Sequence, residues 1–422
     1  MGILRIQQIH AKQLIDSRGN PTVEAEVITH YSLGTAIVPS GASTGAKEAH
    51  ELRDEGISFN GKGVKKAVKN INSIINKELH FWNTDEQKDI DYKLIEMAGP
   101  NKKKLGANAT LAVSMANTRA AAHSHKLHLF EYLNALYDGN SYSLPVPFAN
   151  IINGGVHAGN SLQFQEFMIA PIKASSFSEA TRAVAEIYHE LKKIIEKEYG
   201  KESTSVGDEG GFAPKVDTPE EALDLIKKAI WGAGYKGKIG IAMDAAASEF
   251  YDAKTKTYEA VKGKKMSSDE LADYYLDLIH KYDIISVEDP FDEEDFHAWR
   301  LFRKRTDIQV VADDLTVSNK EIIKQAVKEN ACNSLLLKIN QIGTITEAME
   351  AAQEAEKNKW TVMVSHRSGE TEDSYIADLA VGIGCGQIKL GAPARGERTA
   401  KYNQLLRIEE YLGNKGKYAK WK

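Results

Sequence analysis

Cysteine is nearly absent from this sequence, because its 422 residues include only Cys332 and Cys385. The two have no CxxC partner and no regular spacing, so they support neither a disulfide framework nor a zinc site. Such scarcity is typical of proteins in a reducing compartment. We therefore expect a cytoplasmic location.

An excess of positive charge is also missing. The chain has 54 Lys and Arg against 59 Asp and Glu, which gives a formal net charge of −5. A broad nucleic-acid surface requires a clustered basic excess, so we expect no nucleic-acid partner. A small anionic ligand would instead need positive charge at one place.

Long apolar runs are missing as well. Arg5 and Lys12 interrupt the N-terminus before an apolar signal region can form, and Ile6 stands where a myristoylation pattern requires Ser or Thr. The least charged long stretch, residues 107–118, is rich in Ala, Asn, Ser and Thr. It is too short and too polar to cross a bilayer, so we expect neither a secretory signal nor a membrane span.

The pattern of the sequence changes near residue 135. Before it, alternating residues at 22–29 predict a short antiparallel meander, and helical patterns follow at 63–79, 85–98 and 107–127. After it, short apolar runs alternate with amphipathic helices, as in repeated β-α units. We predict an N-terminal α+β domain over 1–135 and a β/α barrel over 136–422, which suits the chain length.

Two of the predicted helices begin with a capping-box pattern. Thr84 with Gln87 predicts the start of the second helix, and Ser318 with Glu321 predicts the start of a later one. In each pair the hydroxyl would accept a hydrogen bond from the backbone three residues on.

Polar side chains end six successive apolar runs of the barrel region. They are Asp244, Glu288, Asp313, Lys338, His366 and Lys389. From Glu288 onward they are spaced by roughly one β-α unit. The C-terminal ends of the strands meet at one face of such a barrel, so we expect these residues to converge there.

Three of the six residues are carboxylates, and carboxylates in one pocket repel one another unless a cation lies between them. Asp244, Glu288 and Asp313 offer only oxygen ligands, which favour a hard ion such as Mg²⁺. The structural alternative is a set of salt bridges from these acids to Lys338 and Lys389.

The amine of Lys338 is a candidate base. Neighbouring positive charge at a metal site would lower its pKa, and a neutral amine can accept a proton. We therefore expect proton abstraction beside a carboxylate, with metal ions stabilising the negative charge that develops.

Two glycine-rich loops are further candidates. The segment Gly207-Asp-Glu-Gly-Gly211 offers Glu209 as an acid for a leaving group, although the same letters are common in surface turns. The segment Gly41-Ala-Ser-Thr-Gly45 lacks the ending of a P-loop, and it reads either as a closing lid or as an ordinary loop.

Two other segments carry candidate binding residues. His157 stands among glycines, and Gln165 and Glu166 lie in an otherwise apolar run. A loop histidine of this kind is usually only solvated. Arg367, between His366 and Ser368, is a candidate bidentate phosphate ligand, or it pairs only with a neighbouring acid.

Six motifs together resemble the enolase family from the first strand to about residue 410. They are Ser17-Arg-Gly-Asn-Pro-Thr22, Pro39-Ser-Gly-Ala-Ser-Thr-Gly45, Gly207-Asp-Glu-Gly-Gly211, Leu336-Leu-Lys-Ile-Asn-Gln-Ile-Gly343, Val364-Ser-His-Arg-Ser-Gly-Glu-Thr-Glu-Asp373 and Gly391-Ala-Pro-Ala-Arg395. The resemblance implies an N-terminal α+β capping domain and an atypical barrel, ββαα(βα)6, in which not every strand is parallel. It also implies the reversible dehydration of 2-phosphoglycerate to phosphoenolpyruvate in glycolysis and gluconeogenesis, with two Mg²⁺ ions per site. A Lys or His base beside Mg²⁺ is a known arrangement in enolase-superfamily sites.

The resemblance also implies a role for each site residue. By carry-over, Asp244, Glu288 and Asp313 bind the first Mg²⁺ and Ser43 binds the second; Lys338 takes the C2 proton and Glu209 assists loss of the C3 hydroxyl; Arg367 and Ser368 hold the phosphate; Lys389 lies near the substrate carboxylate; and Gln165, Glu166, His157 and His366 fill the remaining positions. Val156 and Leu390 depart from the usual family residues, but neither carries a reacting group.

Rival interpretations stay open at this stage. One is another acid-sugar dehydratase or racemase on the same metal triad, and a second makes Lys338 a Schiff-base lysine. A third is a non-catalytic surface receptor that uses the C-terminal lysines, a role that could coexist with catalysis in a secondary cell-surface or secreted pool. The resemblance implies a homo-oligomer, a dimer or an octamer.

Overall fold

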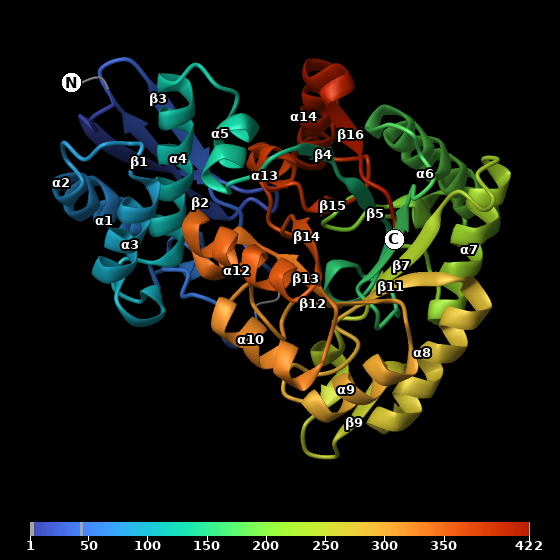
Figure 1. The fold of residues 1–422 in the computed structure, drawn as a ribbon. Helices are drawn as coiled ribbons and strands as arrows, with labels where there is room; N and C mark the ends of the chain where they lie inside the picture. The colour runs from blue at the N-terminus through green and yellow to red at the C-terminus, as the bar shows by residue number, and fades with distance from the viewer. Residues whose placement is uncertain (1–3, 43–44, 422) are drawn as a thin grey trace.

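The computed structural model describes residues 4–42 and 45–421. Its N-terminal part begins with an antiparallel sheet of three strands in the order β1-β2-β3 (Figure 1). These are β1 (Gln8–Ile15), β2 (Pro21–Ile28) and β3 (Leu33–Ile37). The predicted meander is confirmed.

Helices follow where the sequence predicts them. The helix predicted at 63–79 consists of α1 (Lys65–Asn70), a π-helical turn at Ile71–Ile75 and α2 (Asn76–Glu78). The helices predicted at 85–98 and 107–127 are α3 (Gln87–Ala98) and α4 (Ala107–Ser124), and the helix α5 (Leu129–Leu136) was not predicted. Helix α4 packs on the sheet so closely that a Cβ on Gly34 would lie 2.0 Å from the Ala116 carbonyl oxygen. Position 34 therefore requires glycine.

The barrel closes in the order β11-β12-β13-β14-β15-β5-β6-β7. The strands are β5 (Val146–Asn153), β6 (Glu166–Ala170), β7 (Gly240–Asp244), β11 (Ile284–Glu288), β12 (Gln309–Ala312), β13 (Ser334–Leu337), β14 (Thr361–Ser365) and β15 (Gly386–Lys389). Strand β6 runs antiparallel to both β5 and β7, and the other neighbouring pairs are parallel. Side chains such as Phe148, Met168 and Leu336 fill the interior, so the barrel is a packed core.

Helices cover the outside of the barrel (Figure 1). They are α6 (Phe177–Tyr199), α7 (Pro219–Gly232), α8 (Ser268–Tyr282), α9 (Phe296–Arg305), α10 (Lys320–Glu329), α11 (Ile339–Ile342), α12 (Ile345–Lys357), α13 (Tyr375–Ile383) and α14 (Gly396–Leu412). Because α6 and α7 both follow β6 and the later strands alternate with helices, the order is ββαα(βα)6, with α11 as an added turn. The predicted fold class is confirmed.

Short elements complete the chain. They are the strands β4 (Tyr142–Leu144), β8 (Tyr251–Asp252), β9 (Thr257–Val261), β10 (Lys264–Met266) and β16 (Gly416–Tyr418), and the 3-10 turns Ser58–Gly61, Pro100–Lys102, Gly155–His157, Lys201–Thr204, Ala247–Phe250 and Gly413–Lys415. Strands β8 to β10 form a small separate sheet, and β16 pairs with β4. In the described chain no helix has the length and apolarity to cross a membrane. The boundary after residue 135 stays a prediction.

The two predicted capping boxes are wrong. The Thr84 hydroxyl donates to the Leu4 carbonyl, and the Gln87 amide turns inward to Asp91 and Ser114, so α3 begins without a side-chain cap. At α10 the cap is the next residue, Asn319, whose side chain accepts from two backbone N–H groups. Hydrogen-bond partners that are distant in the sequence compete for the same side chains, and the local sequence pattern gives no information about such partners.

Candidate active site

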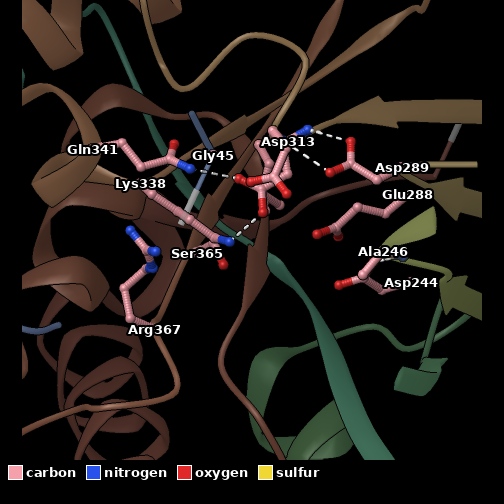
Figure 2. A network of polar contacts seen from close by, with 12 residues as sticks. Gly45, Asp244, Ala246, Glu288, Asp289, Asp313, Lys338, Gln341, Ser365 and Arg367 are labelled. Carbon is pink, nitrogen blue, oxygen red and sulfur yellow. Dashed lines mark hydrogen bonds and ion pairs between the residues drawn. The ribbon is translucent and has the colours of Figure 1, made fainter. Parts of the chain in front are cut away.

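The six polar residues that end the barrel strands converge at one face. Asp244, Glu288 and Lys389 are the last residues of β7, β11 and β15, and Asp313, Lys338 and His366 each follow a strand directly. Figure 2 shows Asp244 and Glu288 on one side of a shared space, with Lys338 and Arg367 opposite. The convergence expected from the sequence is confirmed, because parallel strands carry their C-terminal residues to the same end.

The ammonium of Lys389 lies among three carboxylates. Its Nζ is 3.0 Å from Asp244 Oδ2, 2.9 Å from Glu288 Oε1 and 3.0 Å from Glu166 Oε1. All four side chains are buried. Burial raises the pKa of Glu288, and the neighbouring Asp244 raises it further. One ammonium cannot neutralise three buried carboxylates, so this side of the site has excess negative charge.

The second lysine is paired with one acid. Lys338 Nζ donates to Asp313 Oδ2, and Gln341 Nε2 donates to the other carboxylate oxygen at 2.8 Å (Figure 2). Burial is the largest single influence on the pKa of Lys338 and lowers it, but the neighbouring acids, first Asp313 and then Glu288, raise it, and the net pKa lies above its ordinary value. The lowering expected from the sequence depends on a cation bound beside the amine, so it stays a prediction; in the chain itself the nearest charged partner of the amine is an acid.

The salt-bridge alternative and the metal alternative use the same acids. The chain forms the salt bridges, yet at this end of the barrel the acids outnumber the amines. The metal ligands that Asp244, Glu288 and Asp313 can offer are all carboxylate oxygens. Such a set fits a hard cation. Two groups in the described part of the chain bring ligand atoms within 4.8 Å of one another, Asp289 with Asp313 and Asp314, and Glu166 with Glu209 and His366. Asp244 and Glu288 share the Lys389 ammonium instead.

Asp289 is a site residue that the sequence reasoning missed. It follows Glu288 at the end of β11, and its two carboxylate oxygens accept from the backbone N–H groups of Asp313 and Asp314, both at 2.9 Å. This contact fixes the turn that carries Asp313. Burial raises the pKa of Asp289, with Asp314 as the next cause. Its place beside a strand-ending acid was the one available signal.

Glu209 is buried and lines the same cavity as the two lysines, so the interpretation of its loop as a surface turn is wrong. Its Oε2 accepts from Asn150 Nδ2 at 2.8 Å, and its Oε1 lies 3.6 Å from His366 Nε2. The pKa of Glu166 is raised by burial first and by Glu209 second. Asn150, inside β5, gave no signal in the sequence.

Arg367 forms an ion pair with Glu48 of the N-terminal part. Its two terminal nitrogens lie 3.2 and 3.1 Å from the carboxylate oxygens, and one donates to Asn340 at 3.0 Å. Ser368 Oγ accepts from the Ala42 N–H at 2.7 Å. The candidate phosphate-binding residues thus contact the 41–51 segment. Ser43 lies outside the described residues, and so does the side chain of His157.

One cavity joins the two halves of the site. Its lining contains eight of the candidate residues: Gln165, Glu166, Glu209, Lys338, His366, Arg367, Ser368 and Lys389. Acids, amines and a guanidinium therefore face one small polar space. Such an arrangement can hold an anion, carry a cation and move protons to or from a bound substrate.

Comparisons with known proteins agree over nearly the whole chain. The family model described as Enolase, N-terminal domain, matches residues 6–133, and the one described as Enolase, C-terminal TIM barrel domain, matches residues 141–422. The chain is 56% identical over 410 residues to an enolase of Methanocaldococcus jannaschii, covering 97% of this chain and 96% of that protein. It is 54% identical to an enolase of Methanococcus aeolicus, covering 97% of this chain and 96% of that protein. It is also 54% identical to an enolase of Methanococcus vannielii, covering 96% of this chain and 95% of that protein.

Proposed function

The chain belongs to the enolase family and is a phosphopyruvate hydratase, a carbon–oxygen lyase, and we propose that it dehydrates 2-phospho-D-glycerate to phosphoenolpyruvate reversibly with Mg²⁺. The observation that carries the Mg²⁺ dependence is the excess of buried carboxylates over amines at the barrel's C-terminal end. Asp244, Glu288 and Asp313 would hold one ion, and Ser43 a second. Bound Mg²⁺ would supply positive charge to stabilise the substrate carboxylate as the C2 proton leaves.

Lys338 is the proposed base at C2. An amine accepts a proton only in its neutral form, and the contact with Asp313 favours the protonated form. Separation of Asp313 from Lys338 is therefore a condition for this step. Asp289 accepts from the backbone N–H of Asp313 and Gln341 donates to its side chain, so the acid is held in place and the amine of Lys338 is the group that would move.

Glu209 is the proposed acid that protonates the departing C3 hydroxyl. Asn150 donates to one of its oxygens and leaves the other on the side of His366. Base and acid come from different loops of the same cavity, which suits removal of a proton and a hydroxyl from two adjacent carbons. Glu166, His157 and Gln165 complete the proposed set around them.

Arg367, Ser368 and Lys389 are the proposed anion ligands. A guanidinium can bind two phosphate oxygens at once, whereas a buried ammonium suits the substrate carboxylate. Glu48 now pairs with Arg367, so phosphate would compete with an internal carboxylate for the same guanidinium. The anion-binding residues favour a phosphorylated substrate over an unphosphorylated sugar acid.

The wider proposals follow from the family. We propose a cytoplasmic enzyme of glycolysis and gluconeogenesis that assembles as a homo-oligomer, a dimer or an octamer, and that has a secondary surface-receptor role. The domains proposed are residues 1–135 and 136–422.

An absorbance assay of phosphoenolpyruvate formation tests the proposed function. The purified chain should convert 2-phosphoglycerate with Mg²⁺, lose this activity in excess EDTA and regain it when Mg²⁺ is added back. Turnover that EDTA does not affect, or turnover of unphosphorylated sugar acids alone, would refute the proposal.

A further inference from the structure

A fully buried arginine outside the proposed catalytic set contacts three parts of the site. Arg398, in the first turn of α14, donates to the carbonyl oxygens of Arg367 at 2.6 Å, Ser368 at 2.7 Å and Asp208 at 3.0 Å. It also lies 2.7 Å from His366 Nδ1. One guanidinium thus connects the loop of the proposed acid to the loop of the proposed phosphate ligands.

The contact with His366 has a chemical consequence. A guanidinium has donors and no acceptor, so Nδ1 must present its lone pair. The imidazole is then neutral and carries its proton on Nε2, which is the atom that lies 3.6 Å from Glu209 Oε1. Burial lowers the pKa of His366, and the charge of Arg398 lowers it further, in agreement with a neutral ring.

We propose that Arg398 is a positioning residue that fixes the tautomer of His366, so that the ring presents an N–H to Glu209 and does not exchange protons during the reaction. This inference rests on the proposed role of Glu209 at the C3 hydroxyl. The ring then places a fixed N–H 3.6 Å from the carboxylate of the acid. Arg398 also holds Asp208, the neighbour of that acid, in register with the phosphate loop.

The close packing around the ring requires glycine at position 391. Gly391 lies against all three groups, and a Cβ there would be 2.7 Å from the Glu209 carbonyl oxygen, 3.0 Å from Arg398 Cδ and 3.1 Å from His366 Cε1. Its φ of +80° also favours glycine. A side chain at position 391 would therefore push the imidazole and the guanidinium apart.

The direct test is the imidazole ¹⁵N spectrum of His366 in the Mg²⁺-loaded enzyme, assigned with a His366→Gln variant. The two neutral tautomers and the imidazolium have distinct pairs of ¹⁵N shifts. We expect the neutral form with the proton on Nε2 from mildly acidic to mildly alkaline pH. A protonated ring at neutral pH, or a proton on Nδ1, would overturn the proposal without any variant of Arg398.

Variants then test the role of the arginine. In Arg398→Ala we expect the His366 signals to change tautomer or to titrate, dehydration to fall about 10- to 100-fold, and C2 proton exchange to persist. Added guanidinium ion should restore part of both the spectrum and the rate. Lys401→Met removes another fully buried cation from α14, one turn later, and should leave the His366 spectrum unchanged.

The outcomes separate this proposal from the proposed function. Equal loss of proton exchange and dehydration in Arg398→Ala, or a His366 spectrum like that of the parent enzyme, would contradict the positioning role. If Glu209→Gln dehydrates normally while the tautomer of His366 is as expected, the role of the acid fails and the hydrogen-bond assignment stands. If Arg398→Ala does not fold, the spectrum of the parent enzyme still decides the tautomer.

Discussion

The charge balance around Lys389 makes a quantitative prediction for Lys389→Met. This change keeps the length of the side chain and removes an ammonium that lies within 3.0 Å of three buried carboxylates. Removing one partner of a buried ion pair costs about 3–5 kcal/mol, because the remaining charge is left without compensation. In EDTA we expect the free energy of unfolding to fall by about that amount.

Mg²⁺ should reverse much of this loss. If Asp244 and Glu288 are metal ligands, Mg²⁺ replaces the positive charge that Lys389→Met lacks. In this variant no ammonium competes with Mg²⁺ for the same carboxylate oxygens. A ligand at about 100 times its Kd stabilises the folded state by about 2.7 kcal/mol. Mg²⁺ should therefore stabilise the variant more than the parent protein, as measured by urea unfolding with EDTA or with MgCl₂.

The pH dependence of the loss has a defined sign. Burial holds the pKa of Glu288 and of Glu166 above their ordinary values, so the folded state favours their protonated forms. Without the ammonium these pKa values rise further. Stability is then present at low pH and is lost as the pH rises through the folded-state pKa values. The loss in Lys389→Met should be larger at alkaline than at acidic pH.

Lys401→Met is the matched control. Lys401 is also buried and pairs with Glu370 at 2.6 Å, outside the proposed metal site. This variant should lose stability too, but Mg²⁺ should not restore it. Equal stabilisation of both variants by Mg²⁺, or of neither, would refute the assignment of the acids as metal ligands.

Two other predictions follow from single side chains. Lys338→Ala should abolish exchange of the C2 proton with solvent, whereas Glu209→Gln should retain exchange and lose dehydration; ¹H NMR in D₂O measures both, and identical behaviour would show that base and acid are wrongly assigned. Burial raises the pKa of Asp378 to about 6 from 3.8, so this carboxyl stabilises the fold when protonated and loses that contribution as the pH rises from about 4 through 6. At pH 8 the free energy of unfolding of Asp378→Asn, measured with urea, should therefore exceed that of the parent protein by about 1–3 kcal/mol. Near pH 4 the two proteins should be equally stable. The same difference at both pH values would contradict this prediction.

The sequence predicts the barrel and its polar strand ends because both depend on local patterns. A strand that is buried on both faces reads as an apolar run, and the residue that ends the run lies at the barrel mouth whatever its partners are. Asp244, Glu288 and Lys389 could be placed this way. The order ββαα(βα)6 came from the family resemblance and not from periodicity, which does not distinguish the antiparallel β6 from its neighbours.

Pairing between side chains could not be predicted in the same way. The sequence allows salt bridges from the strand-ending acids to Lys338 and Lys389 but does not say which acid pairs with which amine. In the fold Lys338 pairs with Asp313, the largest of the causes that raise its pKa. Asn150 and Arg398 are likewise invisible in one sequence, because each acts through a contact with a residue at least 30 positions away. Such contacts depend on tertiary packing, as do the two failed capping boxes.

The structure also explains why the barrel needs the N-terminal part for its site. The loop after β13 carries Lys338 and Gln341 and leads into α12, and its geometry is held by groups of α3 and α4. Asp91 accepts from the Thr346 N–H at 2.9 Å, and Ser114 accepts from the Ile345 N–H at 3.0 Å, so the N-terminal part caps the first turn of α12. On the other side, Glu48 reaches both Gln341 and Arg367. The base loop and the anion loop are thus held against one domain, and a barrel expressed alone would lack both supports.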